Sequence, residues 1–333
     1  MKVAVGLSGG VDSCVTAMLL QKAGHDVCGV TMTLGRADEA ESLNATRLAA
    51  ERLGLELEVL DFSGEWKRNV ADYVRETYLA GLTPNPCVRC NETVKMALLP
   101  RAAFALGCDF FATGHYAAIE DGRLFRAADK TKDQSYFLYR ADREVLRRTL
   151  FPLGAMTKVE VREIAREAGL EVAGKRDSQD FCGGDAVAMV GAEDREGNIV
   201  DTSGKVLGRH RGFWHYTIGK RKGLGIGGGT PYYVVALDAS RNEVVVAFKD
   251  VAQVTEFEIG SLVEFPCGLE GALSVKVRSA GEPKGPVKVE KLGDGRARVC
   301  CEEGIVGVAP GQSAVFYRND EVAGGGIIRQ TRM

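Results

Sequence analysis

The sequence predicts an α/β protein in which a doubly wound parallel sheet is followed by small all-β domains. Two observations carry this prediction. The first half of the chain alternates short apolar runs with segments of helical periodicity, which is the pattern of a parallel sheet covered by helices. From Val206 onward, short β-type runs alternate with turn sequences such as Asp294-Gly295 and Pro310-Gly311.

The predicted strands of the first half are short and apolar, as buried strands of a parallel sheet are. They cover residues 2–7, 26–34, 56–61 and 110–113, and apolar residues at helical spacing predict helices at 13–23, 45–53, 66–80 and 94–106. In such a sheet ligands bind beyond the carboxyl ends of the strands. We therefore expect a site in the loops that follow Leu7, Leu34 and Thr113.

The second half begins with a predicted helix at residues 158–168 and a loop-rich segment that runs to about Gly204. The β-type runs beyond it cover residues 232–237, 243–247, 274–278, 287–291, 297–301 and 313–317. At 333 residues the chain suits two or three domains. We predict an α/β domain over residues 1–145, a central connecting domain over 146–204, and a β-barrel-like region over 205–333.

Composition is that of an ordinary globular protein, with 45% hydrophobic and 26% charged residues and a net charge of −2. The apolar run from Met1 to Leu7 is far too short for a signal peptide or a membrane span, so we expect a cytosolic protein without a membrane partner. In the cytosol the nine cysteines stay reduced, and catalytic or metal-binding roles outrank structural disulfides.

The strongest motif is Ser8-Gly9-Gly10-Val11-Asp12-Ser13, between the first predicted strand and the first predicted helix. Two glycines allow a sharp turn, after which consecutive N–H groups and the positive end of the helix face an anion. The motif therefore predicts a phosphate-binding loop. The alternative is an ordinary strand-to-helix turn, in which Asp and Ser only cap the helix.

This loop resembles that of the N-type ATP pyrophosphatases, which have an adenine nucleotide alpha hydrolase-like fold and cleave ATP between the α and β phosphates to adenylate a substrate. Six further segments, in order along nearly the whole chain, resemble the tRNA-specific 2-thiouridylases. They are TPNPCVRCN (83–91), ATGHY (112–116), KDQSYFL (132–138), DSQDFC (177–182), YTIGKRKGLG (216–225) and PGQSAVFY (310–317).

The resemblance implies ATP-dependent 2-thiolation of the wobble uridine of tRNA, with ATP and Mg²⁺ bound and region 205–333 on the tRNA. It implies an ATP site of Gly6, Leu7, Ser8, Gly9, Gly10, Val11, Asp12, Ser13, Met32 and Gly114. The residues that it implies against tRNA are His115, Lys132, Asp133, Gln134 and Gln312. Asn85, Pro86 and Cys87 would touch the target base, which must leave its stack before its carbonyl can be reached.

The resemblance also implies a persulfide mechanism. Cys182 would carry a terminal sulfur received from a donor, which is a persulfide carrier or a cysteine desulfurase; sulfide is the donor for a route without a protein persulfide. Cys90 would attack this persulfide and release the sulfur to the adenylated uracil, leaving a Cys90–Cys182 disulfide. We expect both thiols in exposed polar loops, near Arg89 or near Lys175 and Arg176, where a thiolate is favoured. The other cysteines except Cys87 fall in helix or strand patterns and are predicted to pack in cores, namely Cys14, Cys28, Cys108, Cys267, Cys300 and Cys301.

Position 87 departs from the best-known branch of the family, which has an aspartate there that is proposed for proton transfer. Here Cys87, Cys90 and Cys182 supply three thiolates able to converge on one site. Three cysteines can hold an iron–sulfur cluster with one iron left open to sulfide, so a cluster mechanism is a second hypothesis.

Residues 205–222 contain six Lys/Arg residues and no acid, with Phe213, Trp214 and Tyr216 among them. This stripe predicts phosphate contacts and base stacking, or else a solvated face whose aromatic residues fill a small core. His25 and His210 are expected at the surface. Two other function classes stay open. A small-molecule ATP pyrophosphatase would not need the paired cysteines or the basic β-rich half, and a non-catalytic tRNA-binding protein would not need the ATP loop.

Overall fold

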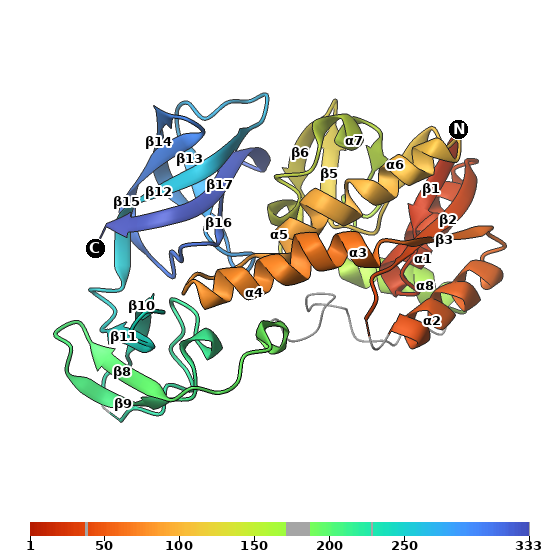
Figure 1. The fold of residues 1–333 in the computed structure, drawn as a ribbon. Helices are drawn as coiled ribbons and strands as arrows, with labels where there is room; N and C mark the ends of the chain where they lie inside the picture. Colours follow the sequence, from red (N-terminus) through yellow and green to blue (C-terminus); the bar gives the residue numbers. More distant parts are fainter. Residues whose placement is uncertain (37–38, 171–186, 228, 333) are drawn as a thin grey trace. The chain divides into compact units, whose positions relative to one another are not determined.

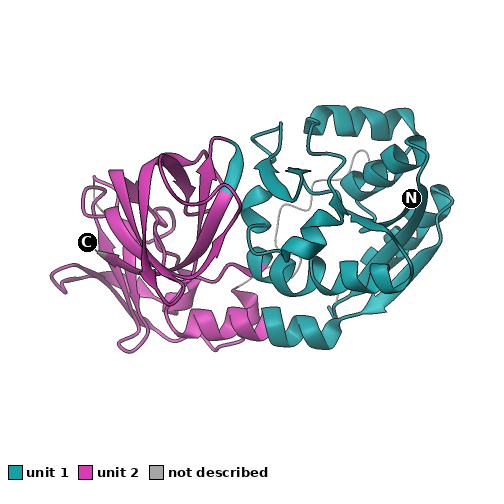
Figure 2. Cartoon of the chain, turned by 90° about the horizontal axis from the view of Figure 1, so that it is seen from above, with its two compact units in different colours: residues 1–70, 87–183, 320–322 teal, residues 71–86, 184–319, 323–333 magenta. Residues whose placement is uncertain are grey.

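The computed structural model describes residues 1–36, 39–170, 187–227 and 229–332. The chain divides into two compact units (Figures 1 and 2). The first comprises Met1–Val70, Cys87–Gly183 and Asp320–Val322, and the second comprises Ala71–Pro86, Gly184–Asn319 and Ala323–Met333. Each unit has hydrophobic clusters of its own. The domain boundaries at residues 145 and 204 stay a prediction.

The first unit contains a five-stranded parallel sheet in the order β3-β2-β1-β4-β7. Its strands are β1 (Lys2–Gly6), β2 (Asp26–Thr33), β3 (Leu57–Asp61), β4 (Phe110–Ala112) and β7 (Thr149–Leu150). The predicted doubly wound sheet is confirmed, and the four predicted strands agree within one residue at each end; β7 was not predicted. From β1 the strand order runs in both directions, so the carboxyl ends of β1 and β4 form the topological switch point at which such folds bind ligands.

Helix α1 (Val11–Lys22) is buried on two sides, and this fixes the start of the helix beside the switch point. Toward the sheet, Ala17 and Leu20 pack with Val3 and Val5 of β1. On another side, Cys14 and Val15 pack with Val161 and Ala165 of α8 (Lys158–Glu167). Because α1 is apolar nearly all round, it behaves as a core helix. Its packing against α8 brings the first turns of the two helices together.

The helical segments predicted at 66–80 and 94–106 are confirmed, although π-helical turns interrupt them. The first is a succession of α3 (Ser63–Trp66), a π-helical turn (Lys67–Ala71) and α4 (Asp72–Leu79), of which α4 belongs to the second unit. Before the second come α5 (Pro86–Cys90) and a π-helical turn (Asn91–Lys95), and α6 covers Leu98–Ala105. A π turn inserts one residue without changing the apolar pattern enough to be seen in the sequence.

The remaining elements of the first unit flank the sheet. They are α2 (Glu39–Arg52), the hairpin strands β5 (Ala117–Glu120) and β6 (Arg123–Arg126), the 3-10 turn η3 (Ser135–Phe137) and α7 (Arg143–Arg147). The hairpin was not predicted. Its turn residues Asp121 and Gly122 both have positive φ, 49° and 73°, which is the backbone of a tight hairpin turn.

The second unit contains two β structures. One is a sheet in the order β10-β11-β8-β9, made of β8 (Gly197–Asp201), β9 (Val206–His210), β10 (Tyr233–Asp238) and β11 (Glu243–Ala247). The other runs β12-β15-β14-β13-β16-β17, and β12 also pairs with β17, which closes a barrel. Its strands are β12 (Gln253–Glu264), β13 (Leu273–Lys276), β14 (Lys284–Gly293), β15 (Arg296–Val306), β16 (Ser313–Arg318) and β17 (Glu321–Arg332). The predicted small all-β domains are confirmed, although β8, β9, β12 and β17 were not predicted.

Within the described part of the chain, no helix combines the length and the apolar character that crossing a membrane requires.

Candidate active site

The predicted phosphate loop connects β1 to α1 at the switch point. β1 ends at Gly6, α1 begins at Val11, and no side chain caps the helix at Gly10. Ser13 closes the loop, because its Oγ accepts a hydrogen bond from the N–H of Ser8 at 3.2 Å and donates one to the carbonyl of Gly10 at 3.0 Å. The first N–H groups of α1 are thus left for solvent or for an anion.

The two glycines of the loop meet different constraints. Gly9 has a φ of +66°, and a Cβ there would lie 2.9 Å from backbone atoms of Ala45 and Thr46. Gly10 has an extended backbone with a φ of −95°, and a Cβ there would come no closer than 3.4 Å, to the Oγ of Ser8. Only Gly9 is therefore required by the backbone that surrounds the loop.

Substitution of each glycine by alanine tests this account. We expect Gly9→Ala to lower the free energy of unfolding by at least about 2 kcal/mol, since it combines a left-handed φ with a backbone clash. We expect Gly10→Ala, the matched control, to cost under about 1 kcal/mol. Denaturant unfolding without nucleotide measures both, and equal costs would contradict the loop geometry.

A lysine that the sequence analysis missed completes the loop. The Nζ of Lys158 lies 2.7 and 2.8 Å from the two carboxylate oxygens of Asp12, and the hydroxyl of Tyr116 donates to Asp12 at 2.9 Å. The Lys158 side chain is 9% exposed and that of Asp12 is 32% exposed. Ammonium, carboxylate and phenol are therefore packed together at the start of α1, beside the phosphate loop.

The sequence did contain a signal for Lys158. A lysine in the first turn of a helix opposes the helix dipole, so it needs a compensating partner. The turn itself is well specified: Thr157 and Glu160 form a capping box, and the N–H of Lys158 donates to Asp129 at 3.1 Å. The side-chain hydrogen bond from Thr131 is the largest cause that lowers the pKa of Asp129. These bonds hold Lys158 in place against Asp12.

The loop after β4 closes over the same helix start. A Cβ on Gly114 would lie 2.9 Å from the backbone carbon and the Cβ of Asp12, so glycine permits the close approach of this loop to α1. Met32 lies near the end of β2, opposite Leu60 of β3, and its side chain is partly exposed. Gly114, in the loop after β4, and Met32, near the end of β2, both lie at the carboxyl edge of the sheet. Their contact with adenosine stays a prediction.

His115 is buried and neutral. It is 5% exposed, its Nδ1 is 2.8 Å from the Oγ1 of Thr113, and its ring packs edge-on to Phe151 at 6.1 Å. Burial, with a smaller contribution from Lys95, lowers the pKa of His115 well below its usual 6.5. At physiological pH it therefore offers an uncharged imidazole.

The pH dependence of stability tests the neutral state of His115. Because the folded pKa is depressed, the unfolded chain binds the proton first as the pH falls, and stability is lost below about pH 6.5. We expect the wild type to lose up to about 1.4 kcal/mol per pH unit relative to His115→Asn. Denaturant unfolding of both proteins between neutral pH and about pH 5 measures this. A difference that does not change with pH would refute it.

The segment 132–134 is tied to Tyr116 and to β6. Asp133 has a fully buried carboxylate that accepts from the Nε of Arg126 at 3.4 Å and from the N–H groups of Ala127 and Ser135 at 3.2 and 3.1 Å. Gln134 exchanges hydrogen bonds with the backbone of Tyr116, at 2.8 and 2.9 Å. Lys132 is partly exposed. Their contacts with tRNA stay predictions, and Asp133 has a structural partner.

In the second unit, Gln312 holds the segment that precedes α5. Its Nε2 donates to the carbonyl of Pro84 at 2.7 Å, and its Oε1 accepts from the Nδ2 of Asn85 at 3.1 Å. The N–H of Thr83 donates to the carbonyl of Pro310 at 2.8 Å. The motifs at 83–91 and 310–317, which are far apart in sequence, are therefore adjacent in the fold. Pro86 is the first residue of α5, a position that proline favours.

Cys87 and Cys90 lie on α5, three residues apart, which puts them on one face of the helix. Cys90 is 3% exposed, so the prediction of an exposed loop thiol is wrong for this residue. Arg89 does not act as an isolated cation, since it donates to the carbonyl of Asn69 at 3.1 Å and pairs with Glu92 at 3.2 Å. Cys182, like Lys175 and Arg176, lies outside the described residues.

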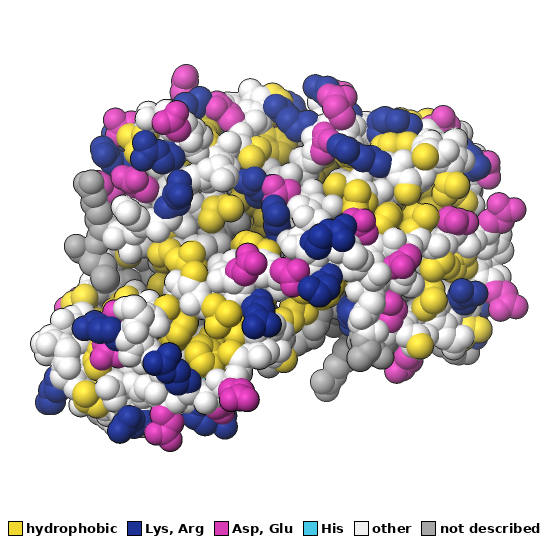
Figure 3. Space-filling model, in the orientation of Figure 1, with side chains coloured by type: hydrophobic (Ala, Val, Ile, Leu, Met, Phe, Trp, Pro, Cys, Tyr) yellow, Lys and Arg dark blue, Asp and Glu magenta, His cyan; other side chains and the backbone are white. Residues whose placement is uncertain are grey.

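The basic stripe divides into core and surface. Phe213 and Trp214 are 4% and 6% exposed and pack with Ile199 and Val244, so they fill the small core, as one alternative predicted. The six cations are exposed, namely Lys205, Arg209, Arg211, Lys220, Arg221 and Lys222. On the face seen in Figure 3, Lys and Arg side chains are interspersed with Asp and Glu, in keeping with the small net charge.

The surface position predicted for His210 is wrong. It is 4% exposed, and its Nδ1 accepts from the N–H of Gly212 at 2.9 Å. It lies opposite Gly197, where a Cβ would come within 2.6 Å of the imidazole, so the absence of a side chain on β8 makes room for the ring. His25 is half-buried.

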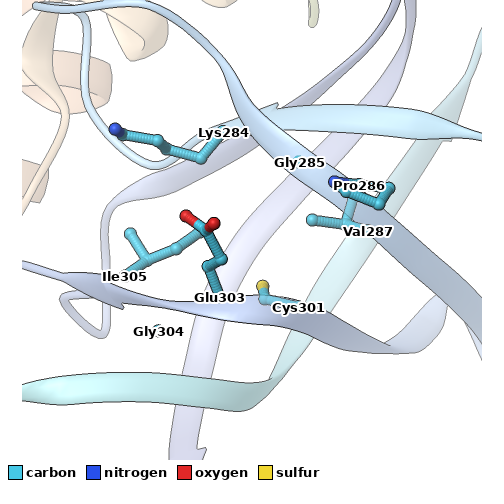
Figure 4. Close-up of a pocket in the computed structure, with 8 residues that line it drawn as sticks. All are labelled: Lys284, Gly285, Pro286, Val287, Cys301, Glu303, Gly304 and Ile305. Carbon is cyan, nitrogen blue, oxygen red and sulfur yellow. The ribbon is translucent and has the colours of Figure 1, made fainter.

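A small pocket lies on the barrel between β14 and β15 (Figure 4). It is lined by Lys284, Gly285, Pro286, Val287, Cys301, Glu303, Gly304 and Ile305. None of the predicted site residues is among them. Burial, with a smaller contribution from Cys300, raises the pKa of Cys301 to about 11, which makes it a poor nucleophile. This pocket is not the candidate active site.

Comparison with known proteins gives matches over nearly the whole chain. Family models match in three consecutive parts: a tRNA methyl transferase HUP domain at residues 1–183, a tRNA methyl transferase PRC-barrel domain at 188–248 and an aminomethyltransferase beta-barrel domain at 253–328. Relatives named tRNA-specific 2-thiouridylase MnmA include that of Trichormus variabilis, 43% identical over 99% of both chains. That of Chloroflexus aurantiacus is 44% identical over 98% of both chains. A solved 4-thiouridine synthetase–RNA complex with bound ATP matches 54% of this chain and 44% of its own, with 21% identity and a TM-score of 0.34.

Proposed function

This chain belongs to the tRNA-specific 2-thiouridylase family, and on that premise we propose that it replaces the 2-oxygen of a tRNA wobble uridine by sulfur, using ATP. The observation that carries the proposal is the phosphate loop at the switch point, completed by the hydrogen-bonded cluster of Asp12, Tyr116 and Lys158. A small-molecule ATP pyrophosphatase or a non-catalytic tRNA-binding protein is not favoured, because relatives of this name align over 99% of the chain.

ATP activates the uracil. The 2-oxygen attacks the α-phosphorus, pyrophosphate leaves, and the carbonyl oxygen becomes part of a good leaving group. The N-terminus of α1 and the Nζ of Lys158 are suited to stabilise the charge that develops on the phosphates. Mg²⁺ commonly binds through one or two carboxylates together with substrate phosphates, and the one-third exposed Asp12 fits such a ligand. Bound there, the ion would neutralise the leaving pyrophosphate.

The target base would reach the start of α5. Asn85, positioned by Gln312, and the half-buried Cys87 are the residues for its polar edge. The neutral imidazole of His115 offers a hydrogen bond without a charge to desolvate. The cations of residues 205–222, for which the sequence predicts phosphate contacts, are exposed and suit the tRNA backbone.

Sulfur transfer uses Cys90 and Cys182. The Cys90 thiolate attacks the persulfide on Cys182, a disulfide forms, and hydrosulfide is released, adds to C2 of the uracil and displaces AMP. A thiol reductant then restores both cysteines. The burial of Cys90 suits this order of reaction steps, because a site that excludes water protects the released hydrosulfide from loss. The donor that loads Cys182 is a cytoplasmic persulfide carrier or a cysteine desulfurase, whereas free sulfide would act directly as the nucleophile on the adenylated uracil.

A specific observation also supports the cluster hypothesis. Cys87 and Cys90 lie one helical turn apart on α5, a spacing that fits two thiolate ligands of one iron–sulfur cluster; the third, Cys182, lies outside the described residues. A cluster would supply an open iron that binds sulfide. Iron content and visible absorption are measured on the anaerobically purified wild type and on Cys87→Ser. These measurements decide between the cluster route and the persulfide route. A fully active protein without iron rules out the cluster.

The proposed function is tested with ATP, bulk tRNA and sulfide or a persulfide donor, by measuring pyrophosphate and analysing tRNA nucleosides. We expect pyrophosphate to require tRNA and 2-thiouridine to require the sulfur source as well. Pyrophosphate formed without tRNA would favour a small-molecule substrate. No pyrophosphate under any condition would favour a binding protein.

A further inference from the structure

Two cysteines that the proposed reaction does not use are in contact within the first unit. The Sγ of Cys28 in β2 and the Sγ of Cys108, just before β4, are 3.6 Å apart. Cys28 lies opposite Ala4 of β1, and Cys108 precedes the first residue of β4. The pair therefore lies toward the amino ends of the strands, whereas the phosphate loop follows the carboxyl end of β1.

Hydrogen bonds hold the backbone at both cysteines in place. Cys28 is held in register with β1 within the parallel sheet. Cys108 is held by the hydrogen bond from its N–H to the carbonyl of Ala103 at 3.2 Å, and Arg148 donates to the carbonyl of Cys108 at 3.1 Å. The next residue, Asp109, donates to the carbonyl of Lys2 at 2.8 Å. Both thiols thus belong to a rigid framework.

The distance discriminates between two kinds of bridge. A disulfide needs its sulfurs at about 2.05 Å, so the pair would have to close by roughly 1.5 Å. A single soft atom with bonds of about 2.3 Å holds two sulfurs at about 3.8 Å at the tetrahedral angle, and closer at narrower angles. The observed 3.6 Å is the hydrogen-bond contact of the two unbridged thiols, and it is already close to the separation in a one-atom bridge, so binding would need little movement.

We propose that Cys28 and Cys108 form a two-thiol binding site for a single soft, thiophilic atom, of the class of monosubstituted trivalent arsenicals. Among the residues with described positions, no group of three or more His, Cys, Asp or Glu side chains is placed to hold a metal ion. A four-coordinate zinc site is thus not supported there, whereas a trivalent centre with its own organic substituent needs two thiols only. Cys28 is half-buried, which leaves a route for the ligand, and Cys108 is 2% exposed.

The chemistry balances without an oxidant. An arsenical oxide R–As=O condenses with two thiols to R–As(S–Cys)₂, the two thiol protons leave with the oxide as water, and no atom changes its oxidation state. Burial, followed by the hydrogen bond to Cys108, raises the pKa of Cys28 to about 12. The Cys28 thiol therefore stays protonated at neutral pH, which slows thiolate-dependent exchange and still supplies one proton of the condensation.

Phenylarsine oxide is the probe. The full-length protein is treated with one equivalent, challenged with excess monothiol, digested and analysed by mass spectrometry. We expect the arsenical to join the Cys28 and Cys108 peptides, and to be lost at least about tenfold faster from Cys28→Ser and from Cys108→Ala, since only a bidentate adduct resists a monothiol. Cys300→Ser, a strand cysteine that is half-buried like Cys28, is the matched control and should retain the adduct.

The assay reads the peptides separately, because Cys87, Cys90 and Cys182 also carry thiols. The proposed site is overturned if the wild-type peptides of Cys28 and Cys108 carry no arsenical. It is also overturned if Cys28→Ser retains the arsenical against the monothiol as well as the wild type does. Because neither cysteine belongs to the proposed machinery, Cys28→Ser should thiolate tRNA at the wild-type rate. A failed arsenical test therefore leaves the proposed function intact, and a failed thiolation test leaves this site intact.

Discussion

Replacement of Cys90 by serine is expected to abolish 2-thiouridine formation while tRNA-dependent pyrophosphate release continues. In the persulfide route the Cys90 thiolate breaks the sulfur–sulfur bond on Cys182, and a serine hydroxyl at the same position is far too weak a nucleophile to do so. Loss of a catalytic nucleophile costs at least roughly a thousandfold in rate. Adenylation does not use the thiol, so pyrophosphate reports the adenylation step and 2-thiouridine reports the sulfur-transfer step.

Thionucleoside analysis and pyrophosphate release are measured for the wild type, Cys90→Ser and Cys301→Ser. Cys301, 9% exposed in β15, is the control for loss of a buried thiol outside the site and should thiolate normally. Free sulfide supplied in place of the persulfide donor should restore thiolation in Cys90→Ser, since it bypasses sulfur release. Thiolation at the wild-type rate by Cys90→Ser with the natural donor would end the assignment.

Lys158→Met is expected to slow tRNA-dependent pyrophosphate release by roughly a hundredfold to a thousandfold, because a preorganised cation beside the phosphates is lost. Methionine preserves the length of the side chain and removes the charge. The Asp12 carboxylate then loses its partner at 2.7 Å. Since its side chain is 32% exposed, we expect a stability cost of about 1–2 kcal/mol, below that of a fully buried pair.

Lys22→Met is the matched control, because Lys22 is an exposed lysine at the end of α1 and should leave both quantities unchanged. Affinity for tRNA, measured by filter binding, should also stay the same in Lys158→Met, which separates a phosphate role from a tRNA role. Pyrophosphate release within about twofold of the wild type would refute the role of Lys158. Asp12→Asn combined with Lys158→Met shows by a double-mutant cycle whether the two residues act as a pair.

The predictions that held rest on local patterns. Apolar runs specify β1 to β4 because helices cover the strands of a parallel sheet, and Gly9 indicates the loop because its left-handed φ favours glycine. The elements that were missed lack such a pattern. β17 contains three consecutive glycines, Gly324–Gly326, and its pairing with β12 forms only on barrel closure, while the π turns leave the apolar period almost unchanged.

The sequence by itself determined the class of the sheet, the position of the phosphate loop and, through its motifs, the family. Only the tertiary structure decided which distant residues meet: Lys158 with Asp12 across 146 positions, Gln312 with Asn85 across 227, and the contact between Cys28 and Cys108. It also decided that Cys90 and His210 are buried. Local patterns are written in neighbouring residues, whereas partners and burial depend on how complete elements pack, and a single sequence does not contain those distances.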